Sequence, residues 1–110
     1  MEKKRILVVD DEKAVRVLMA AALKADNYEI DIAENGFQAI GYVNKISYNL
    51  VITDYSMPEM DGVELTRRIK SRYPAIPILM VTGSESVRDL LLCILNHLGQ
   101  IFGSEIQFQK

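Results

Sequence analysis

The stretch Ile6-Leu7-Val8-Val9-Asp10-Asp11 decides the fold, because a continuous apolar run ends abruptly in two acids. A strand buried on both faces has this composition, and such strands are typical of parallel sheets. Residues 50–52 repeat the pattern and lead to Asp54. A third apolar run, interrupted only by Pro77, predicts a strand over residues 76–81. Weaker signals predict two more strands, over about residues 28–33 and 105–109.

Residues with helical spacing fill the intervals between these runs. One apolar stripe from residue 13 to residue 25 is expected to face the sheet, formed by Val15, Leu18, Met19 and Ala22. Asn35 is a candidate cap for a helix to about residue 46. Its inward side chains are expected to be Phe37, Ile40 and Val43.

Two more helices are predicted in the second half of the chain. Asp61 and Gly62 open one that runs through Val63, Leu65 and Ile69 and ends before Pro74. Ser84 is a candidate cap for the other, which runs over about residues 85–98 and is expected to stop at Gly99. Strands thus alternate with helices, which predicts an α/β fold around a parallel sheet.

The composition describes one ordinary globular domain of 110 residues, with 49% apolar and 25% charged residues. A net charge of -2 provides no basic field for nucleic acid or an anionic membrane. The single Cys93 cannot form an internal disulfide, which fits a reducing, cytoplasmic setting. The sequence also contains neither a signal peptide nor an apolar stretch long enough to span a bilayer.

The acids that follow the two strongest strands are the candidate site. In an open parallel sheet, ligands bind beyond the carboxyl ends of strands where the strand order reverses. If the first and third strands are neighbours, Asp10, Asp11 and Asp54 converge there. Each like-charge pair at about 4 Å costs roughly 4 kcal/mol at an effective dielectric near 20, so the cluster needs protons or a cation. Mg²⁺ is the natural partner, because it is hard and prefers oxygen ligands. An Asp-Asp pair after a strand is also ordinary turn and cap chemistry, and this alternative stays open.

At this point three motifs resemble a known family. The run VVDDE (residues 8–12) looks like the acidic opening of response-regulator receiver domains. The run DYSMPEMDG (residues 54–62) looks like the phosphorylation-site loop of that family, and ILMVTG (residues 78–83) looks like its fourth strand with the switch hydroxyl. The resemblance covers almost the whole chain. It implies a flavodoxin-like, doubly wound, five-stranded parallel sheet of order 2-1-3-4-5, with residues 1–110 forming one receiver domain.

The resemblance also implies roles for individual residues. Asp54 would be the phospho-acceptor. Asp11, Asp54 and the backbone carbonyl of Ser56 would hold Mg²⁺, and Asp10 would support the ion through water. Thr82 would bond a phosphoryl oxygen, and a lysine after the last strand would pair with the phosphoryl charge.

That lysine is where the chain departs from the family pattern. Lys110 is the best candidate, because it follows the predicted strand over residues 105–109, but it lies farther from Thr82 than the family usually shows. The family's aromatic switch position falls on Gln107, so the usual relay from the hydroxyl to an aromatic ring is expected to be altered or absent. Phe108 is expected to have a core role instead.

The last helix of the family, which normally lies beside the first helix, is missing from the sequence. We therefore expect the chain to be a truncated piece of a longer protein. The run over residues 90–95 is apolar all round, so it either covers the open edge or forms a dimer or output surface. The candidates for that surface are Leu91, Leu92 and Leu95. Cys93 is expected to be a small buried hydrophobe and His97 a surface residue.

The favoured function is a two-component switch that takes a phosphoryl group from a sensor histidine kinase and signals to an effector or a fused output domain. It would assist its own phosphorylation and dephosphorylation without being a turnover enzyme. One alternative is a receiver-like module that only binds or dimerises. Another is a magnesium-dependent phosphatase, which usually has a second Asp two residues after the nucleophile, where this chain has Ser56.

Overall fold

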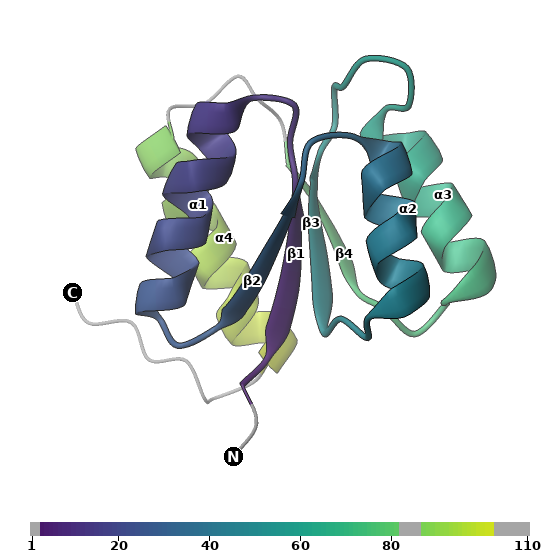
Figure 1. Ribbon diagram of the computed structural model, residues 1–110. Helices are drawn as coiled ribbons and strands as arrows, with labels where there is room; N and C mark the ends of the chain where they lie inside the picture. The colour runs from purple at the N-terminus through teal and green to yellow at the C-terminus, as the bar shows by residue number, and fades with distance from the viewer. Residues whose placement is uncertain (1–2, 82–86, 103–110) are drawn as a thin grey trace.

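The computed structural model describes residues 3–81 and 87–102, in which strands and helices alternate (Figure 1). The elements are β1 (Arg5–Val9), α1 (Lys13–Ala25), β2 (Glu29–Ala33), α2 (Gly36–Lys45), β3 (Leu50–Asp54), α3 (Gly62–Arg72), β4 (Ile78–Val81) and α4 (Val87–Phe102).

The four strands form one parallel sheet of order β2-β1-β3-β4. Strand order reverses between β1 and β3, because β2 lies on one side of β1 and β3 on the other. The parallel, flavodoxin-like α/β fold predicted from the sequence is confirmed. The predicted fifth strand over residues 105–109 lies outside the described residues.

Helices cover both faces of the sheet, which explains why β1 and β3 are apolar without a break. Ile6 and Val8 belong to the core cluster shared with α1 and α4, whereas Leu7 and Val9 belong to the cluster shared with α2 and α3. Successive side chains of a strand point to opposite faces, so one strand serves both clusters. Figure 1 shows α1 and α4 on one side of the sheet and α2 and α3 on the other.

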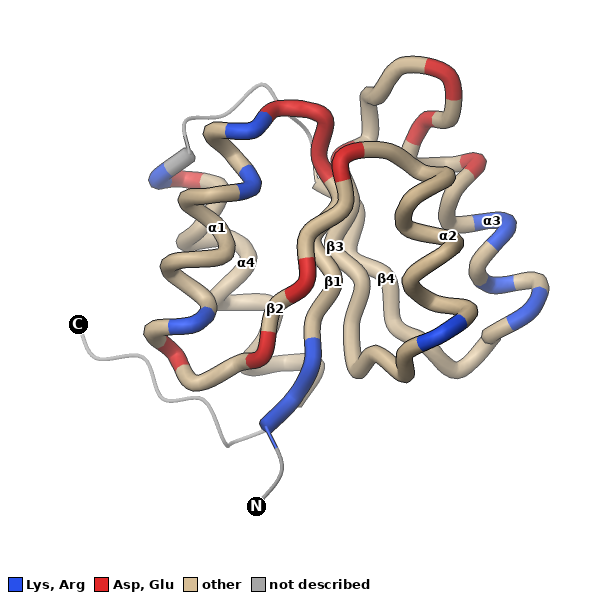
Figure 2. Tube along the Cα trace, viewed as in Figure 1, with Lys and Arg blue, Asp and Glu red and all other residues tan. Residues whose placement is uncertain are grey.

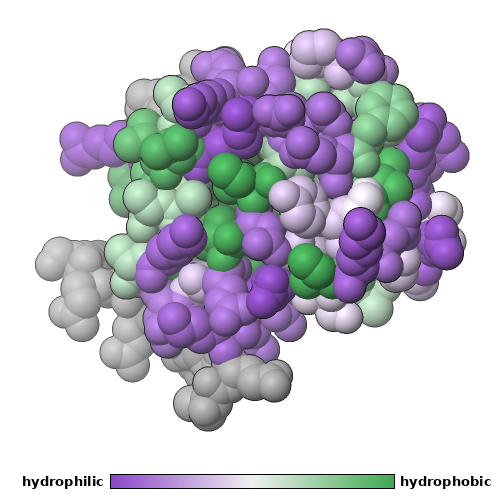
Figure 3. Space-filling model, in the orientation of Figure 1, coloured by the Kyte–Doolittle hydropathy of each residue, from purple (hydrophilic) through white to green (hydrophobic). Residues whose placement is uncertain are grey.

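Two of the apolar side chains expected to face inward do not. Leu18 and Phe37 are about half exposed, and these predictions were wrong. The inward stripe of α2 includes Ala39. Phe37 stands two residues before it, which is about 200° around a helix. Figure 3 shows apolar patches (green) among polar residues on this face of the molecule, including one over α1 at the left of the view.

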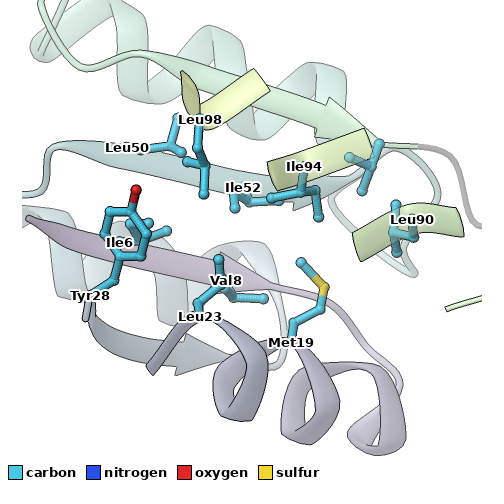
Figure 4. Packing of buried hydrophobic residues seen from close by; sticks show 11 residues of the cluster. Ile6, Val8, Met19, Leu23, Tyr28, Leu50, Ile52, Leu90, Ile94 and Leu98 are labelled. Carbon is cyan, nitrogen blue, oxygen red and sulfur yellow. The ribbon is translucent and has the colours of Figure 1, made fainter. Parts of the chain in front are cut away.

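Helix α4 lies beside α1 on the same face of the sheet (Figure 1). Leu90, Ile94 and Leu98 recur at a spacing of four residues and are buried among side chains of β1, β3 and α1 (Figure 4). Leu91 and Leu95 pack against the edge of this core, and Leu92 is exposed. The broad apolar run of α4 therefore closes the core on this side of the sheet.

The end of α4 and one of its side chains correct the sequence predictions. Gly99 does not stop the helix, which continues to Phe102. The ring centroids of Phe102 and Tyr28 lie 5.8 Å apart, and this packing stabilises the extra turn. Cys93 is exposed rather than buried, because it lies beside the buried stripe of Leu90, Ile94 and Leu98, about 100° around the helix from Ile94. His97 is exposed, as predicted. Ser84, the candidate cap of this helix, lies outside the described residues.

No helix within residues 3–81 and 87–102 combines the length and the apolar composition needed to cross a bilayer.

Candidate functional site

The acidic residues meet at the carboxyl ends of β1 and β3. Asp10 directly follows β1 and Asp54 ends β3, and the two strands pair with Val9 opposite Thr53. One carboxylate oxygen from each of Asp10, Asp11 and Asp54 lies within 4.8 Å of the others. Figure 2 shows acidic segments gathered at the top of the view, at the connections that follow β1, β2 and β3. The sheet thus brings together the three carboxylates that the sequence analysis singled out.

Two hydrogen bonds to the backbone hold Asp10, one through its own N–H and one through its carboxylate. Its N–H donates to the carbonyl of Ala33 at the end of β2, at 3.1 Å. Its Oδ1 accepts a hydrogen bond from the Glu12 N–H at 2.9 Å, which bends the chain into α1. These two bonds leave the carboxylate little freedom to turn away from Asp54.

Burial and like charges make the ionised cluster costly. Burial is the largest cause that raises the pKa of the Asp10 carboxyl; the bond from the Glu12 N–H lowers it, and the charges of Asp54 and Asp11 raise it. Together these effects bring the pKa to about 6. Burial also raises the pKa of Asp54, with the charge of Asp11 in the same direction and the bond from the Ser56 N–H against it. None of the ion pairs found within residues 3–81 and 87–102 reaches these three carboxylates.

The loop after Asp54 is tied down at several points. The Tyr55 N–H donates to the Val81 carbonyl at 2.7 Å, and the Ser56 N–H faces Asp54 Oδ1 at 3.3 Å. Met57 and Met60 are buried in the α2–α3 cluster. The loop that carries the acceptor candidate is thus anchored in the core on one side and to β4 on the other.

Gly62 lets α3 approach this loop closely. Its N–H donates to the Tyr55 carbonyl at 2.9 Å. A Cβ atom at this position would lie 2.4 Å from the backbone oxygen of Asp54, a distance that no side chain tolerates. The sequence placed Gly62 only at the start of a helix, since the contact depends on how α3 packs and cannot be read from the motif.

Two predicted site residues, Thr82 and Lys110, lie outside the described residues, as do Gln107 and Phe108. The last residue of β4 is Val81, which pairs with Asp54 and directly precedes Thr82 in the sequence. The assignments of Thr82 and Lys110 therefore stay predictions.

A groove of about 650 Å³ lies at the opposite edge of the sheet. It is lined by residues 43–49 and 72–77, which follow α2 and α3 and precede β3 and β4. Of the predicted site residues that the structure describes, none lines the groove, and the carboxyl ends of two helices border it. The acidic cluster is the better candidate site, because it has the convergent ionisable groups.

The donor set of the cluster fits Mg²⁺. Mg²⁺ binds oxygen at about 2.0–2.1 Å and often uses one or two carboxylates with waters. The oxygens of Asp10, Asp11 and Asp54 are already gathered within 4.8 Å, and two of these residues are buried. Among the described residues, this is the group of three acidic, His or Cys side chains that could hold an ion. A cation here would relieve the repulsion that raises the pKa of Asp10 and Asp54.

Comparisons with known proteins point to one family. The response regulator receiver domain matches residues 6–98. The chain is 44% identical over 86 residues to the transcriptional regulatory protein ResD of Bacillus subtilis, and 38% identical over 88 residues to the sensor protein EvgS of Escherichia coli. These matches cover 76% and 80% of this chain but 35% and 7% of the two relatives, so the chain spans only a part of each.

Solved structures agree with this. A CheY-like receiver domain from Methanospirillum hungatei superposes with a TM-score of 0.78 at 27% identity, covering 92% of this chain and 98% of the other. The response regulator TrrA of Thermotoga maritima, solved in complex with Mg²⁺-BeF, gives a TM-score of 0.71 at 40% identity, covering 78% of this chain and 75% of the other. With its fold, its acidic strand ends and these matches, the chain belongs to the response regulator receiver domain family.

Proposed function

We propose that this domain is a phosphorylation-dependent switch of a two-component system, in which Asp54 accepts a phosphoryl group from a sensor histidine kinase. The observation that carries the proposal is the convergence of Asp10, Asp11 and Asp54 at the edge where β1 and β3 end. Two structures of one neighbour support it: TrrA is solved with Mg²⁺-BeF and, in another structure, with the histidine kinase ThkA.

The proposed step is a transfer between a nitrogen and an oxygen. A carboxylate oxygen of Asp54 attacks phosphorus, a P–O bond forms, and the P–N bond to the donor histidine breaks with its electron pair going to nitrogen. The bond from the Ser56 N–H holds Asp54 Oδ1, and the anchored loop fixes the direction of attack. A bound Mg²⁺ would offset the charge that gathers on the carboxylates and on the phosphoryl group.

The residues that would hold this ion are Asp11, Asp54 and the Ser56 carbonyl, with Asp10 acting through water. Thr82 and Lys110 are proposed to contact the phosphoryl oxygens. In this proposal the domain assists its own phosphorylation and dephosphorylation, works in the cytoplasm, and does not turn over a separate substrate.

The partner that receives the signal is proposed to meet the exposed side of α4. Leu92 is the candidate contact, since Leu91 and Leu95 are partly taken up by the core. An effector protein, a fused output domain and a second copy of this chain are all candidates for that partner. Nucleic acid and membrane are not proposed as ligands of this domain.

The test is incubation with Mg²⁺ and acetyl phosphate, followed by intact-mass measurement. The wild-type protein should gain the mass of one phosphoryl group, and Asp54→Asn should gain none. Asp26→Asn, an exposed change at the other end of α1, should behave as wild type. If the wild-type protein gains no mass, the switch is refuted and the alternative of a module that only binds or dimerises is favoured.

A further inference from the structure

Arg16 lies on α1 next to the acidic site, and its side chain is largely buried. Only 11% of its side chain is exposed, a low value for a cation on a surface helix. Its Nη1 donates to the backbone carbonyl of Asp10 at 2.7 Å, and its Nη2 lies 3.7 Å from Glu34 Oε2. The planar fork of the guanidinium thus spans the loop after β1 and the loop after β2.

The bond to Asp10 completes the restraint of that residue. The Asp10 N–H is bound to Ala33, its Oδ1 accepts from Glu12, and its carbonyl accepts from Arg16. Arg16 is the one side chain among these partners. Without it, the Asp10 carbonyl would lose a charged donor, and the turn that directs both Asp10 and Asp11 toward Asp54 would loosen.

Arg16 does not act as a counterion for the three carboxylates. Its ion-pair contact is with Glu34, whose own N–H is held by the Gln38 side chain. The pKa of Asp10 stays raised by burial and by its acidic neighbours. A cation close to a divalent ion would in fact repel it. Charge alone therefore predicts that Arg16 weakens metal binding, and geometry predicts that it strengthens metal binding.

We propose that Arg16 is a positioning residue that holds the turn after β1 in the form that binds a divalent cation. The inference rests on the proposed function, since it assumes that the acidic cluster takes Mg²⁺. Some residues do not bind the metal themselves but orient the residues that do. Their removal typically weakens metal affinity by about 10- to 100-fold. Through this turn, Arg16 would set how much Mg²⁺ the domain needs before Asp54 can react.

The experiment measures Mg²⁺ affinity by isothermal titration calorimetry on wild type, Arg16→Gln and Arg16→Lys. We expect Arg16→Gln to bind about 10-fold more weakly. Arg16→Lys keeps the charge but loses the fork, so it should also weaken binding. Arg67→Gln, which removes an exposed arginine paired with Glu64 on α3, is the matched control and should bind as wild type.

A second measurement separates positioning from general loss of structure. Hydrogen exchange of the Glu12 amide in metal-free protein should accelerate in Arg16→Lys, whereas amides of β3 should keep their protection. At saturating Mg²⁺, acetyl phosphate should phosphorylate both Arg16 variants as it does wild type. A misfolded protein would not regain this reaction. If Arg16→Gln does not fold, Arg16→Lys decides the question.

The outcomes are distinct. If the wild-type protein binds Mg²⁺ and the Arg16 variants bind it equally tightly or more tightly, the positioning role is overturned and the proposed function still stands. Absence of Mg²⁺ binding by the wild-type protein overturns the proposed function and this inference together.

Discussion

The stability of the metal-free protein should rise when one buried charge is removed, and Asp10→Asn is the sharpest such change. Asparagine keeps the shape of the side chain, and its oxygen can still accept from the Glu12 N–H. Burial and, to a smaller extent, the charges of the neighbouring acids raise the pKa of Asp10 from 3.8 to about 6, and each pKa unit corresponds to about 1.4 kcal/mol. The ionised carboxyl therefore costs the fold about 3 kcal/mol at pH 7.

The direction in which pH changes the free energy of unfolding follows from proton binding at Asp10. Between pH 3.8 and about 6 the folded protein binds more protons at Asp10 than the unfolded protein, so this residue makes stability fall as pH rises. Above about pH 6 the cost is complete, and below 3.8 it is absent. Asp10→Asn should thus be more stable than wild type by about 3 kcal/mol at pH 7 and by about 1 kcal/mol at pH 4.5.

Urea denaturation in EDTA at these two pH values measures the difference, and thermal unfolding should show a rise of about 10 °C at pH 7. Asp26→Asn, at an exposed position, should change the free energy of unfolding by less than about 0.5 kcal/mol. Saturating Mg²⁺ should narrow the gap, because it stabilises the folded wild-type protein. An Asp10→Asn protein that is less stable than wild type in EDTA at pH 7, or whose advantage does not shrink at pH 4.5, would refute the reasoning.

Three further changes test the packing around the site. Ile94→Ala should lower the free energy of unfolding by about 2–4 kcal/mol, because it empties a buried position on α4. The exposed Leu92→Ala should cost less than about 1 kcal/mol; equal losses in urea would contradict the placement of α4. Gly62→Ala should cost about 1–3 kcal/mol, since its Cβ would overlap the backbone oxygen of Asp54, and an unchanged melting temperature would contradict that contact. Tyr48→Phe should lose about 1 kcal/mol, because the hydroxyl donates to a carboxylate on β2 at 2.7 Å; an unchanged urea midpoint would show that this bond adds nothing to stability.

The sheet and the acidic edge were predictable from the sequence because both depend on short-range signals. A run such as residues 6–9 has one favourable environment, a strand covered on both faces, and the acids at its end follow directly. Once β1 and β3 are neighbours, Asp10 and Asp54 must lie at the same edge. The cap at Asn35 was predictable for the same reason, and its side chain accepts from the Gln38 N–H as a local bond.

The side of the sheet that α4 covers was not predictable. Residues 90–95 are apolar all round, so helical spacing does not distinguish the buried face from the exposed one. The choice depends on the space beside α1, which exists only once the sheet has formed. Cys93 was misassigned for this reason, because its environment depends on the face that α4 presents to the core.

Arg16 was missed for a different reason. A single arginine early in a helix has no spacing pattern, and its function depends on a bond to a backbone carbonyl six residues away. The one signal in the sequence is a cation four residues after three consecutive acids, which is equally typical of an exposed helix face. Contacts of this kind emerge only from the packing of α1 against the loops after β1 and β2.

The most direct test of the account is a titration of metal-free, ¹⁵N-labelled protein with Mg²⁺, followed by NMR of the backbone amides. The account predicts that the largest shifts occur in residues 10–12 and 54–56 and saturate with one ion per chain. Shifts that gather instead at the groove lined by residues 43–49 and 72–77, with none at Asp54, would contradict it.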